Sequence, residues 1–145
     1  MVSDTWFSEI ESTIFTILQY ILVDKSDAPY PSLKCTTSNK NESVEGVATF
    51  PTLYVHMLQP VAIGDDLTNE TINAVRATFE LQVFSNKSET ECRKIMNACI
   101  LEMKKLHFNT PLLADPQSSN GVYYAIARFS RVIASGDTEL VEKVD

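Results

Sequence analysis

The stretch that decides the fold is Val75-Arg76-Ala77-Thr78-Phe79-Glu80-Leu81-Gln82-Val83. Its odd-numbered positions are all apolar, and its even-numbered positions are all polar. Successive side chains of a β-strand point to opposite faces of a sheet, so this alternation predicts a half-buried strand with one apolar and one polar face. No other stretch has so clean a period, and we expect the rest of the chain to be organised around this strand.

The strand continues through residues 85–87 into a well-marked helix, which we expect to be its packing partner. Ser88, with Glu91 three residues later, forms a capping box at the start of this helix. The apolar residues that follow recur at helical spacing, which predicts a stripe that faces the core. They are Cys92, Ile95, Met96, Cys99, Ile100, Met103 and Leu106.

A first helix is predicted near the N-terminus, capped by Ser3 or Asp4 and ending near Asp24. Glu9 and Glu11 lie near its positive end. Its apolar residues follow the i, i+3, i+4, i+7 rhythm of an amphipathic helix. They are Phe7, Ile10, Ile14, Ile17, Leu18 and Ile21, with Phe15 and Leu22 widening the stripe. We interpret this wide surface as facing the core, with an additional contact to a neighbouring subunit as the alternative.

Three further strands are predicted, at Leu33–Ser38, Thr52–Gln59 and Val122–Ile133. The middle one is apolar on both sides, which suggests that it is covered on both faces. In the last one, Tyr123, Ala125, Ala127 and Phe129 share one face, and the choice of inward face stays open.

Three segments are predicted to connect these elements. Ser38–Gly46 is polar and aperiodic, Val61–Asn73 is a long acidic connection between antiparallel strands, and Phe108–Gly121 is a loop or hairpin link.

These elements predict an α+β fold, in which an antiparallel or mixed β-sheet of about four strands packs against two helices. The expected order is helix, strands, helix, strand. A chain of 145 residues is long enough for one ordinary core, so we expect a single domain over residues 1–136. Residues 137–145 are charged and are interpreted as a mobile C-terminal tail.

The chain is acidic, with a formal net charge of -7. Binding of nucleic acid through a general basic surface is therefore excluded, although a negatively charged passage would let DNA cross without sticking. The simpler interpretation is that the acidity keeps the protein soluble. Ile10–Val23 is too short and too mixed to span a membrane, and no signal peptide is predicted.

Little in the sequence indicates catalysis, a cofactor or a metal. The three cysteines form no CxxC pair and are interpreted as reduced structural thiols in a cytosolic setting. The motifs GxSxG, GxGxxG, HExxH and the Walker loop are absent. His56 and His107 have no partner at a suggestive spacing, so a structural histidine is favoured over a catalytic one. Asp65, Asp66 and Glu70 do not have the spacing of an EF-hand.

From Phe50 onward the chain resembles the tail terminator, or tail completion, proteins of long-tailed phages and prophages. Four runs carry the resemblance: Phe50–Val55, Phe79–Lys87, Glu91–Met96 and Tyr123–Ser130. The order of elements also agrees, and the likeness covers most of the chain. The match is one of pattern, and it departs at His107, where the family pattern would have a glycine.

The resemblance implies a mechanical function without catalysis. Such proteins form a ring, expected to be a hexamer, that docks on the last ring of the polymerised tail tube and stops its growth. The ring then offers a face to the head-completion or connector protein. The implied location is the head-proximal end of the virion tail, after assembly in the host bacterial cytoplasm. Asp65, Asp66 and Glu70 are the candidate assembly contacts under this hypothesis.

Two alternatives remain open from the sequence. One is a different head-to-tail joining, or neck, protein of the same particle. The other is a small α+β ligand-binding or enzymatic domain that uses His56, Cys35 or Asp65.

Overall fold

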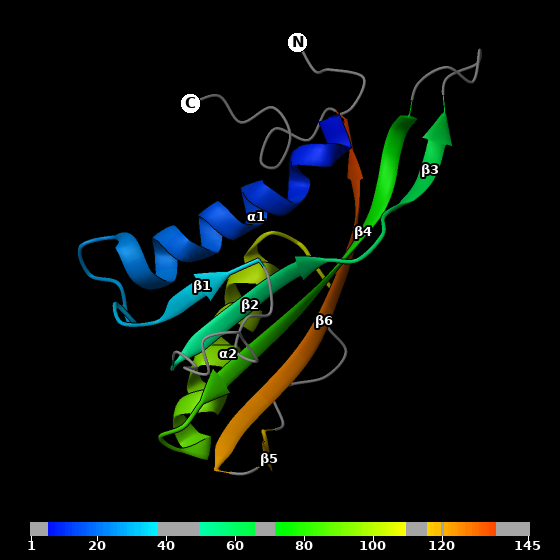
Figure 1. Cartoon of the computed structure of the whole chain (residues 1–145). Coiled ribbons are helices and arrows are strands. Elements are labelled where there is room, and N and C mark those ends of the chain that lie inside the picture. Colours follow the sequence, from blue (N-terminus) through cyan, green and yellow to red (C-terminus); the bar gives the residue numbers. More distant parts are fainter. Residues whose placement is uncertain (1–5, 38–49, 66–71, 110–115, 120, 136–145) are drawn as a thin grey trace.

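A six-stranded mixed sheet and two main helices make up the protein, so the expected α+β class is confirmed (Figure 1). The computed structural model describes residues 6–37, 50–65, 72–109, 116–119 and 121–135. The expected boundary at residue 136, the tail beyond it and the whole of the predicted connection Ser38–Gly46 lie outside the described residues.

The helical elements are η1 (Trp6–Glu9), α1 (Ile10–Gln19), η2 (Tyr20–Asp24) and α2 (Glu89–Lys105). The strands are β1 (Lys34–Thr36), β2 (Thr52–Met57), β3 (Val61–Asp65), β4 (Ile72–Ser85), β5 (Gln117–Ser119) and β6 (Val122–Ala134). The first helix thus runs from a 3-10 turn through an α-helix into a π-helical turn and ends at Asp24, as predicted.

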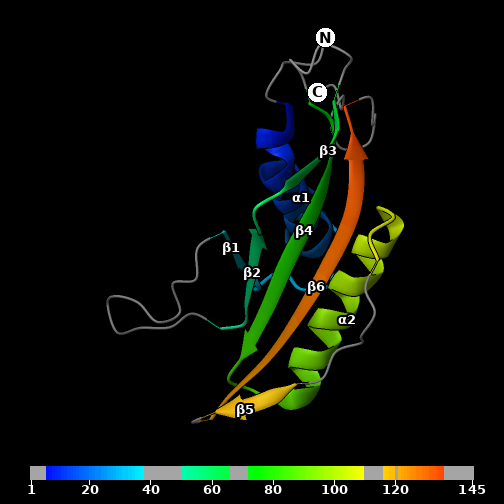
Figure 2. The ribbon, with the colours of Figure 1, turned by 90° about the vertical axis from the view of Figure 1, so that its right-hand side faces the viewer.

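The central strand is β4, which contains the stretch that the sequence singled out. One edge of β4 pairs with β6 along almost its whole length, and the other pairs first with β3 and then with β2. All of these pairings are antiparallel, whereas β1 pairs with β2 in parallel. The long β4 and β6 strands twist together across the molecule, with α2 lying along β6 (Figure 2).

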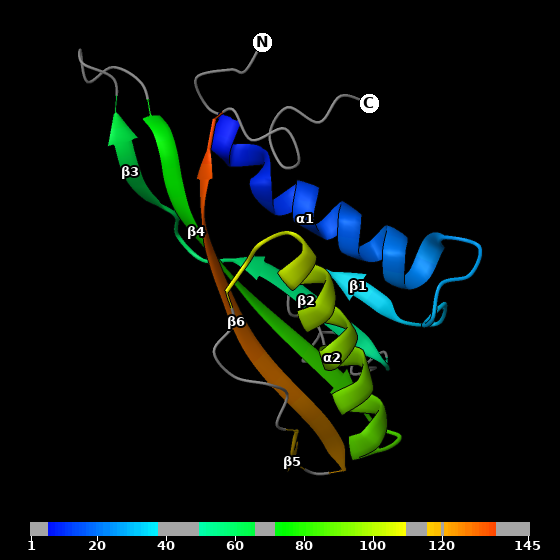
Figure 3. The same cartoon turned by 180° about the vertical axis from the view of Figure 1, so that it is seen from behind.

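The strand register places the apolar side chains of three strands on one face of the sheet. Val83 lies between Leu53 and Ala125, and all three are buried. Phe79 and Phe129 are also paired and buried. Helix α2 packs on β4 and β6 while α1 packs on β1 and β2, so both helices cover this same face (Figure 3). We call it the covered face.

The sheet has six strands where about four were expected. The additional strands, β3 and β5, fall in the segments interpreted as the acidic connection and the hairpin link. Each has at most five residues, too few for a clear alternation of apolar and polar positions. Pairing with a long neighbouring strand, which the sequence does not display, is what makes them strands.

Two further expectations are corrected or decided. Cover on both faces of the second predicted strand is wrong, because Leu53 and Val55 are buried while Tyr54 and His56 stay partly exposed. The inward face of β6 is the one that carries Ala125 and Phe129, since both register with buried residues of β4.

Helix α1 buries one line of side chains four residues apart, namely Ile10, Ile14, Leu18 and, in η2, Leu22. The flanking members of the predicted stripe, including Phe7, Phe15 and Ile17, are only partly buried and pack against the core from its margin. The stripe therefore faces mainly the core.

The capping box at the start of α2 is half confirmed. Ser88 Oγ accepts a hydrogen bond from the backbone N–H of Glu91 at 3.0 Å. The carboxylate of Glu91 accepts instead from the hydroxyl of Ser85 at 2.5 Å, at the last position of β4. This contact ties the helix start to the end of the central strand.

At the other end of α2, His107 has a φ of 70°, the left-handed conformation that glycine usually supplies. The N–H of His107 donates to the carbonyl of Lys104 at 2.9 Å, and that of Phe108 donates to Met103 at 3.0 Å. These two bonds form a Schellman motif. The helix therefore ends as it would with a glycine at this position, although a non-glycine residue adopts the left-handed conformation at a cost in conformational energy.

Candidate functional site

The second face of the sheet is not covered by either helix, and we call it the open face. It carries the even-numbered side chains of β4 together with their neighbours on β2 and β6, as the register requires. The cross-strand rows are Tyr54–Gln82–Ile126, His56–Glu80–Arg128, Thr78–Ser130 and Val61–Arg76–Val132.

Glu80 is the centre of a polar cluster on the open face. One of its carboxylate oxygens accepts a hydrogen bond from Nε of Arg128 at 3.0 Å and forms an ion pair with Nη2 of the same side chain, also at 3.0 Å. The other oxygen accepts from Gln82 Nε2 at 3.0 Å. Both oxygens are engaged, so this carboxylate is suited to hold the strands in register rather than to move protons.

A second polar contact links α1 to the edge of the sheet. Glu11 Oε2 accepts from the backbone N–H of Met57 at 2.8 Å and lies 3.4 Å from Nδ1 of His56. Strand β1 pairs with β2 only as far as Tyr54. Beyond that point the carboxylate of Glu11 supplies a hydrogen-bond acceptor for the edge of β2 in place of a neighbouring strand. The contact with Glu11 therefore favours a structural role for His56 over a catalytic one.

The ring of Tyr54 stacks on His56, with 5.8 Å between the centroids. Burial, with Glu80 and Glu11 nearby, raises the pKa of the Tyr54 phenol. The phenol therefore remains protonated around neutral pH and is available as a hydrogen-bond donor on the open face.

Large apolar side chains are also exposed on this part of the sheet. Ile126 is 52% exposed, Val132 is 48% exposed, and Val61 at the start of β3 is 58% exposed. Among the described residues, the outer edge of β6 pairs only with β5, at residues 122–124, and with Asn109, at Ser130. An unpaired strand edge beside exposed apolar groups is a template for association with another chain.

The thiols belong to the other side of the molecule. Burial raises the pKa of Cys35 to about 12, with a further contribution from Asp24, and raises the pKa of Cys92 to about 11. Cys99 is completely buried, and its pKa is raised too. A thiol that stays protonated is a poor nucleophile, so these surroundings argue against Cys35 as a catalytic group.

The residues of the enzymatic alternative do not come together. His56 is on the open face, whereas Cys35 packs against the core of the covered face. The backbone of Asp65 ends β3, and its side chain is not described. The candidate contacts Asp66 and Glu70 lie outside the described residues, so their role in assembly stays a prediction.

Sequence reasoning missed the two contacts that organise the open face, Glu80 with Arg128 and Glu11 with His56. The polar face of β4 was visible in the alternation of residues 75–83. Nothing local, however, indicated that Arg128, 48 positions away, would lie opposite Glu80.

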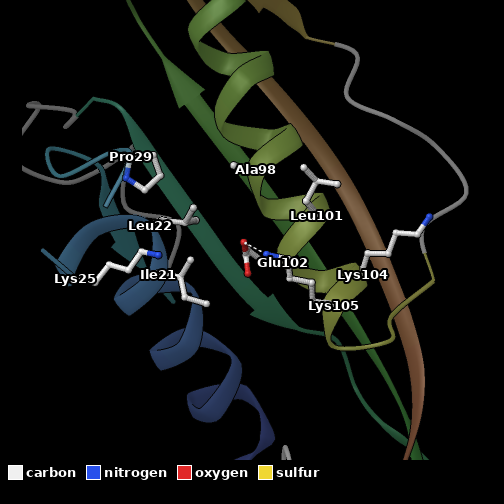
Figure 4. Close-up of a pocket in the computed structure, with 9 residues that line it drawn as sticks. All are labelled: Ile21, Leu22, Lys25, Pro29, Ala98, Leu101, Glu102, Lys104 and Lys105. Atoms are coloured by element: carbon white, nitrogen blue, oxygen red, sulfur yellow. Dashed lines mark hydrogen bonds and ion pairs between the residues drawn. The ribbon is translucent and has the colours of Figure 1, made fainter. Parts of the chain in front are cut away.

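A groove of about 430 Å³ lies between the end of the first helix and α2, on the helix side of the molecule (Figure 4). Ile21, Leu22 and Pro29 line one side, and Ala98 and Leu101 line the other. Lysines and one glutamate complete the lining: Lys25, Glu102, Lys104 and Lys105.

No protein-family model matches the chain, and no curated protein matches it. Among the described residues, no helix has the length and apolar character of a membrane span. Within the same residues, no group of three or more histidine, cysteine, aspartate or glutamate side chains is arranged to hold a metal ion.

Proposed function

We propose that this chain is a structural tail terminator, which forms a ring, expected to be a hexamer, on the end of a phage tail tube. The observation that carries the proposal is the outer edge of β6, which within the described part of the chain is paired only at residues 122–124 and at Ser130, beside the exposed side chains of Ile126 and Val132. The sequence resemblance supplies the function that such a surface would serve.

A ring requires two different surfaces on each copy, because a head-to-tail contact closes only when one patch meets another by rotation. The β6 edge provides backbone donors and acceptors for one side of such a contact. Burying exposed apolar area there would stabilise association by about 25 cal/mol per Å². The partner of this edge on the next copy is a different surface of the same chain.

The remaining features are compatible with a ring that DNA crosses. A chain with a net charge of -7 repels phosphate and gives DNA little to adhere to. Asp65, Asp66 and Glu70 are the proposed contacts with the tube or the connector.

The first test is the state of the purified full chain. Native mass spectrometry and negative-stain imaging should detect rings, either directly or as concentration rises. Ile126→Asp should abolish the rings, because a charge would be buried in the contact. Leu101→Asp is the matched control, since Leu101 is 59% exposed but lies on α2. A strictly monomeric protein at every concentration, also in the presence of tube protein, would contradict the proposal.

The second test uses the polymerising tail-tube protein. Adding the purified chain should cap tube growth, whereas continued growth would favour the neck-protein alternative. Replacing Asp65 and Asp66 by Ser should leave the fold intact and weaken capping, and an equal yield of capped tubes would remove this segment from the contact. A monomer that binds a small molecule near His56 would instead favour the ligand-binding or enzymatic alternative.

A further inference from the structure

One end of the sheet is formed by β3, the start of β4 and the end of β6, and we call it the narrow end. There β4 lies between β3 and β6. Within the part of the chain that the structure describes, no strand pairs with the other side of β3, and β6 meets β5 and Asn109 only further along its length. Figures 1 and 3 show β3 at the margin of this end of the sheet. The narrow end therefore has two edges that can accept another strand.

The backbone groups of β6 point away from the sheet at alternate residues. Ser135 N–H donates to β4 at 2.9 Å, whereas Ser130 exchanges both of its backbone hydrogen bonds with Asn109 at the outer edge. Odd-numbered residues of β6 thus direct their N–H and C=O groups toward β4, and even-numbered residues direct them outward. Val132 and Ala134 therefore present backbone donors and acceptors at the outer edge of the narrow end.

The same alternation applies to β3. The carbonyl of Thr78 accepts from the N–H of Leu58 at 2.8 Å, so even-numbered residues of β4 direct their backbone groups toward β2 and β3. Val61, opposite Arg76, therefore turns its own backbone groups toward β4, and Ala62 turns them outward. The register of β3 becomes irregular only after Ala62, so this short stretch is a regular strand edge.

Exposed apolar side chains mark both edges on the open face. Val61, Arg76 and Val132 form one cross-strand row, and the two valines at its ends are both exposed. Ile63, two positions along β3 from Val61, is 47% exposed. Each edge thus combines outward backbone groups with an exposed β-branched side chain, and the two edges are suited to each other.

The direction of the strands restricts how two copies can meet. Strands β3 and β6 are both antiparallel to β4, so they run in the same direction. Every contact in a cyclic ring repeats one rotation, and strands that lie along the ring axis keep their direction under it. The β3 strand of a neighbouring copy therefore meets β6 in parallel. A two-fold contact would instead join β6 to β6, or β3 to β3, and would leave the other edge unpaired.

We propose that β3 of one copy pairs in parallel with the end of β6 of the next copy, beside Val132, so that the narrow ends form a continuous sheet around the ring. The inference rests on the ring of the proposed function and names the surface that meets β6. Ile126 is six positions away along β6 and lies toward the neighbour's β2, because β2 and β3 pair with the same edge of β4.

The size of this contact has a consequence for assembly. A five-residue strand buries much less surface than the roughly 1,200 Å² that a stable pair of proteins usually requires. Each copy makes one such contact in an open dimer and two in a closed ring. We therefore expect the chain to assemble from monomers into closed rings with few free dimers.

The test is disulfide trapping in the full chain. Within one copy, positions 61 and 132 are separated by β4, so their Cα atoms are roughly 10 Å apart, too far for a disulfide. Oxidation of Val61→Cys/Val132→Cys should therefore link different copies and give a ladder from dimers up to the closed ring. Val61→Cys and Val132→Cys should each give no ladder alone, and their mixture should stop at dimers.

Two controls accompany this experiment. Val61→Cys/Leu101→Cys should give no ladder, because Leu101 is equally exposed but lies on α2. The parent chain, oxidised in parallel, reports any contribution from the native thiols. Ile63→Cys/Val132→Cys covers a register that is displaced by two residues.

The outcomes separate this inference from the proposed function. Rings in native mass spectrometry without a ladder from either cysteine pair would overturn the contact between β3 and β6 and leave the ring intact. The absence of rings, also with tube protein present, would overturn both. Crosslinked dimers of Val132→Cys alone would identify a two-fold contact between β6 strands and would overturn the proposal as well.

A charge on the edge of β3 supplies a second arm. Lysine on an edge strand opposes pairing with another strand, so Val61→Lys should raise the concentration of half-assembly about tenfold or more. Val61 is exposed in the single copy, so the melting temperature of the monomer should not change. Leu101→Lys is the matched control and should assemble as the parent does. Assembly of Val61→Lys at the parental concentration would contradict the proposal.

Discussion

The two faces of the sheet are made by the same strands and differ in almost every physical property. On the covered face, Leu53, Phe79 and Leu81 are completely buried beneath the helices. On the open face, Glu80 and Arg128 form a hydrogen-bonded pair and Ile126 is half exposed. The covered face therefore stabilises the fold, and the open face is available for contacts with other molecules.

This division has an energetic consequence. Removing apolar area from water stabilises the covered face by about 25 cal/mol per Å², while exposed ion pairs on the open face contribute about 1 kcal/mol or less. Substitutions on the covered face should thus change stability, and those on the open face should change association. The predictions below are ordered by the expected size of the change.

The largest effect is expected for Leu81→Asp. Leu81 is completely buried, so the substitution places an unpaired carboxylate in the core and should cost roughly 5 kcal/mol or more. That is comparable to the stability of a whole small domain. Circular dichroism and thermal melting should report an unfolded chain. Ile126→Asp is the control on the open face, and its free energy of unfolding should lie within about 1 kcal/mol of that of the parent. An unchanged melting temperature for Leu81→Asp would show that the covered face is wrongly assigned.

The thiol of Cys35 should be protected by its place on the covered side. With a pKa raised from 9.0 to about 12, its thiolate fraction near pH 8 is about a thousandfold below that of a free thiol. Labelling by a thiol reagent should be slow in the folded protein and fast in urea. Ile126→Cys on the open face should add one rapidly labelled thiol. Rapid labelling of native Cys35 would revive the enzymatic alternative.

The same shift predicts a pH dependence of stability. The folded-state pKa of Cys35 lies above its unfolded value, so the contribution of the protonated thiol is fully present below pH 9.0. It is lost progressively as the pH rises from 9.0 towards 12. Urea unfolding over this range should give a smaller alkaline loss for Cys35→Ala than for the parent.

His107→Gly should stabilise the protein by about 1 kcal/mol, because it relieves the left-handed conformation at the end of α2. This helix covers β4 and β6, so the gain should appear as a higher urea midpoint. His107→Ala keeps the strained conformation and removes the side chain, and it should give no gain. Equal stabilisation by both substitutions would assign the effect to the side chain instead.

The smallest effects are expected for Arg128→Ala and for its control on α2, Arg93→Ala. Arg128 is largely exposed, and Glu80 keeps its bond from Gln82, so the loss should be about 0.5–1 kcal/mol. Arg93→Ala removes an exposed helical pair with Glu89 and should cost about 0.3–0.5 kcal/mol. High salt should reduce both differences in chemical denaturation. A loss of several kcal/mol for Arg128→Ala would mean that the open face contributes to folding as the covered face does.

Several local features were predictable because their cause is local. The alternation of residues 75–83, the cap at Ser88 and the stripe of α2 all reappear in the structure. The strand ends were less predictable: β4 runs from Ile72 to Ser85, further than its clean period. Pairing with β3 and β6 extends it, and pairing is not encoded in the strand's own alternation.

The candidate site was predictable only in part. The polar side chains of β4 were visible from the sequence, but the partner of Glu80 and the contact from Glu11 to the strand edge were not. The groove beside Leu101 was likewise invisible, because α2's stripe identifies the residues that face inward and not the gap between two helices.

The sequence by itself determined which residues of β4 and α2 are apolar on one side, and thereby the α+β class. This follows because side-chain periodicity depends on the geometry of a single element. Only the tertiary structure decided that β1 joins β2 in parallel, that β3 continues along β4, and which side of β6 is buried. These choices depend on contacts between distant segments, and the position of a partner strand leaves no mark on the local pattern.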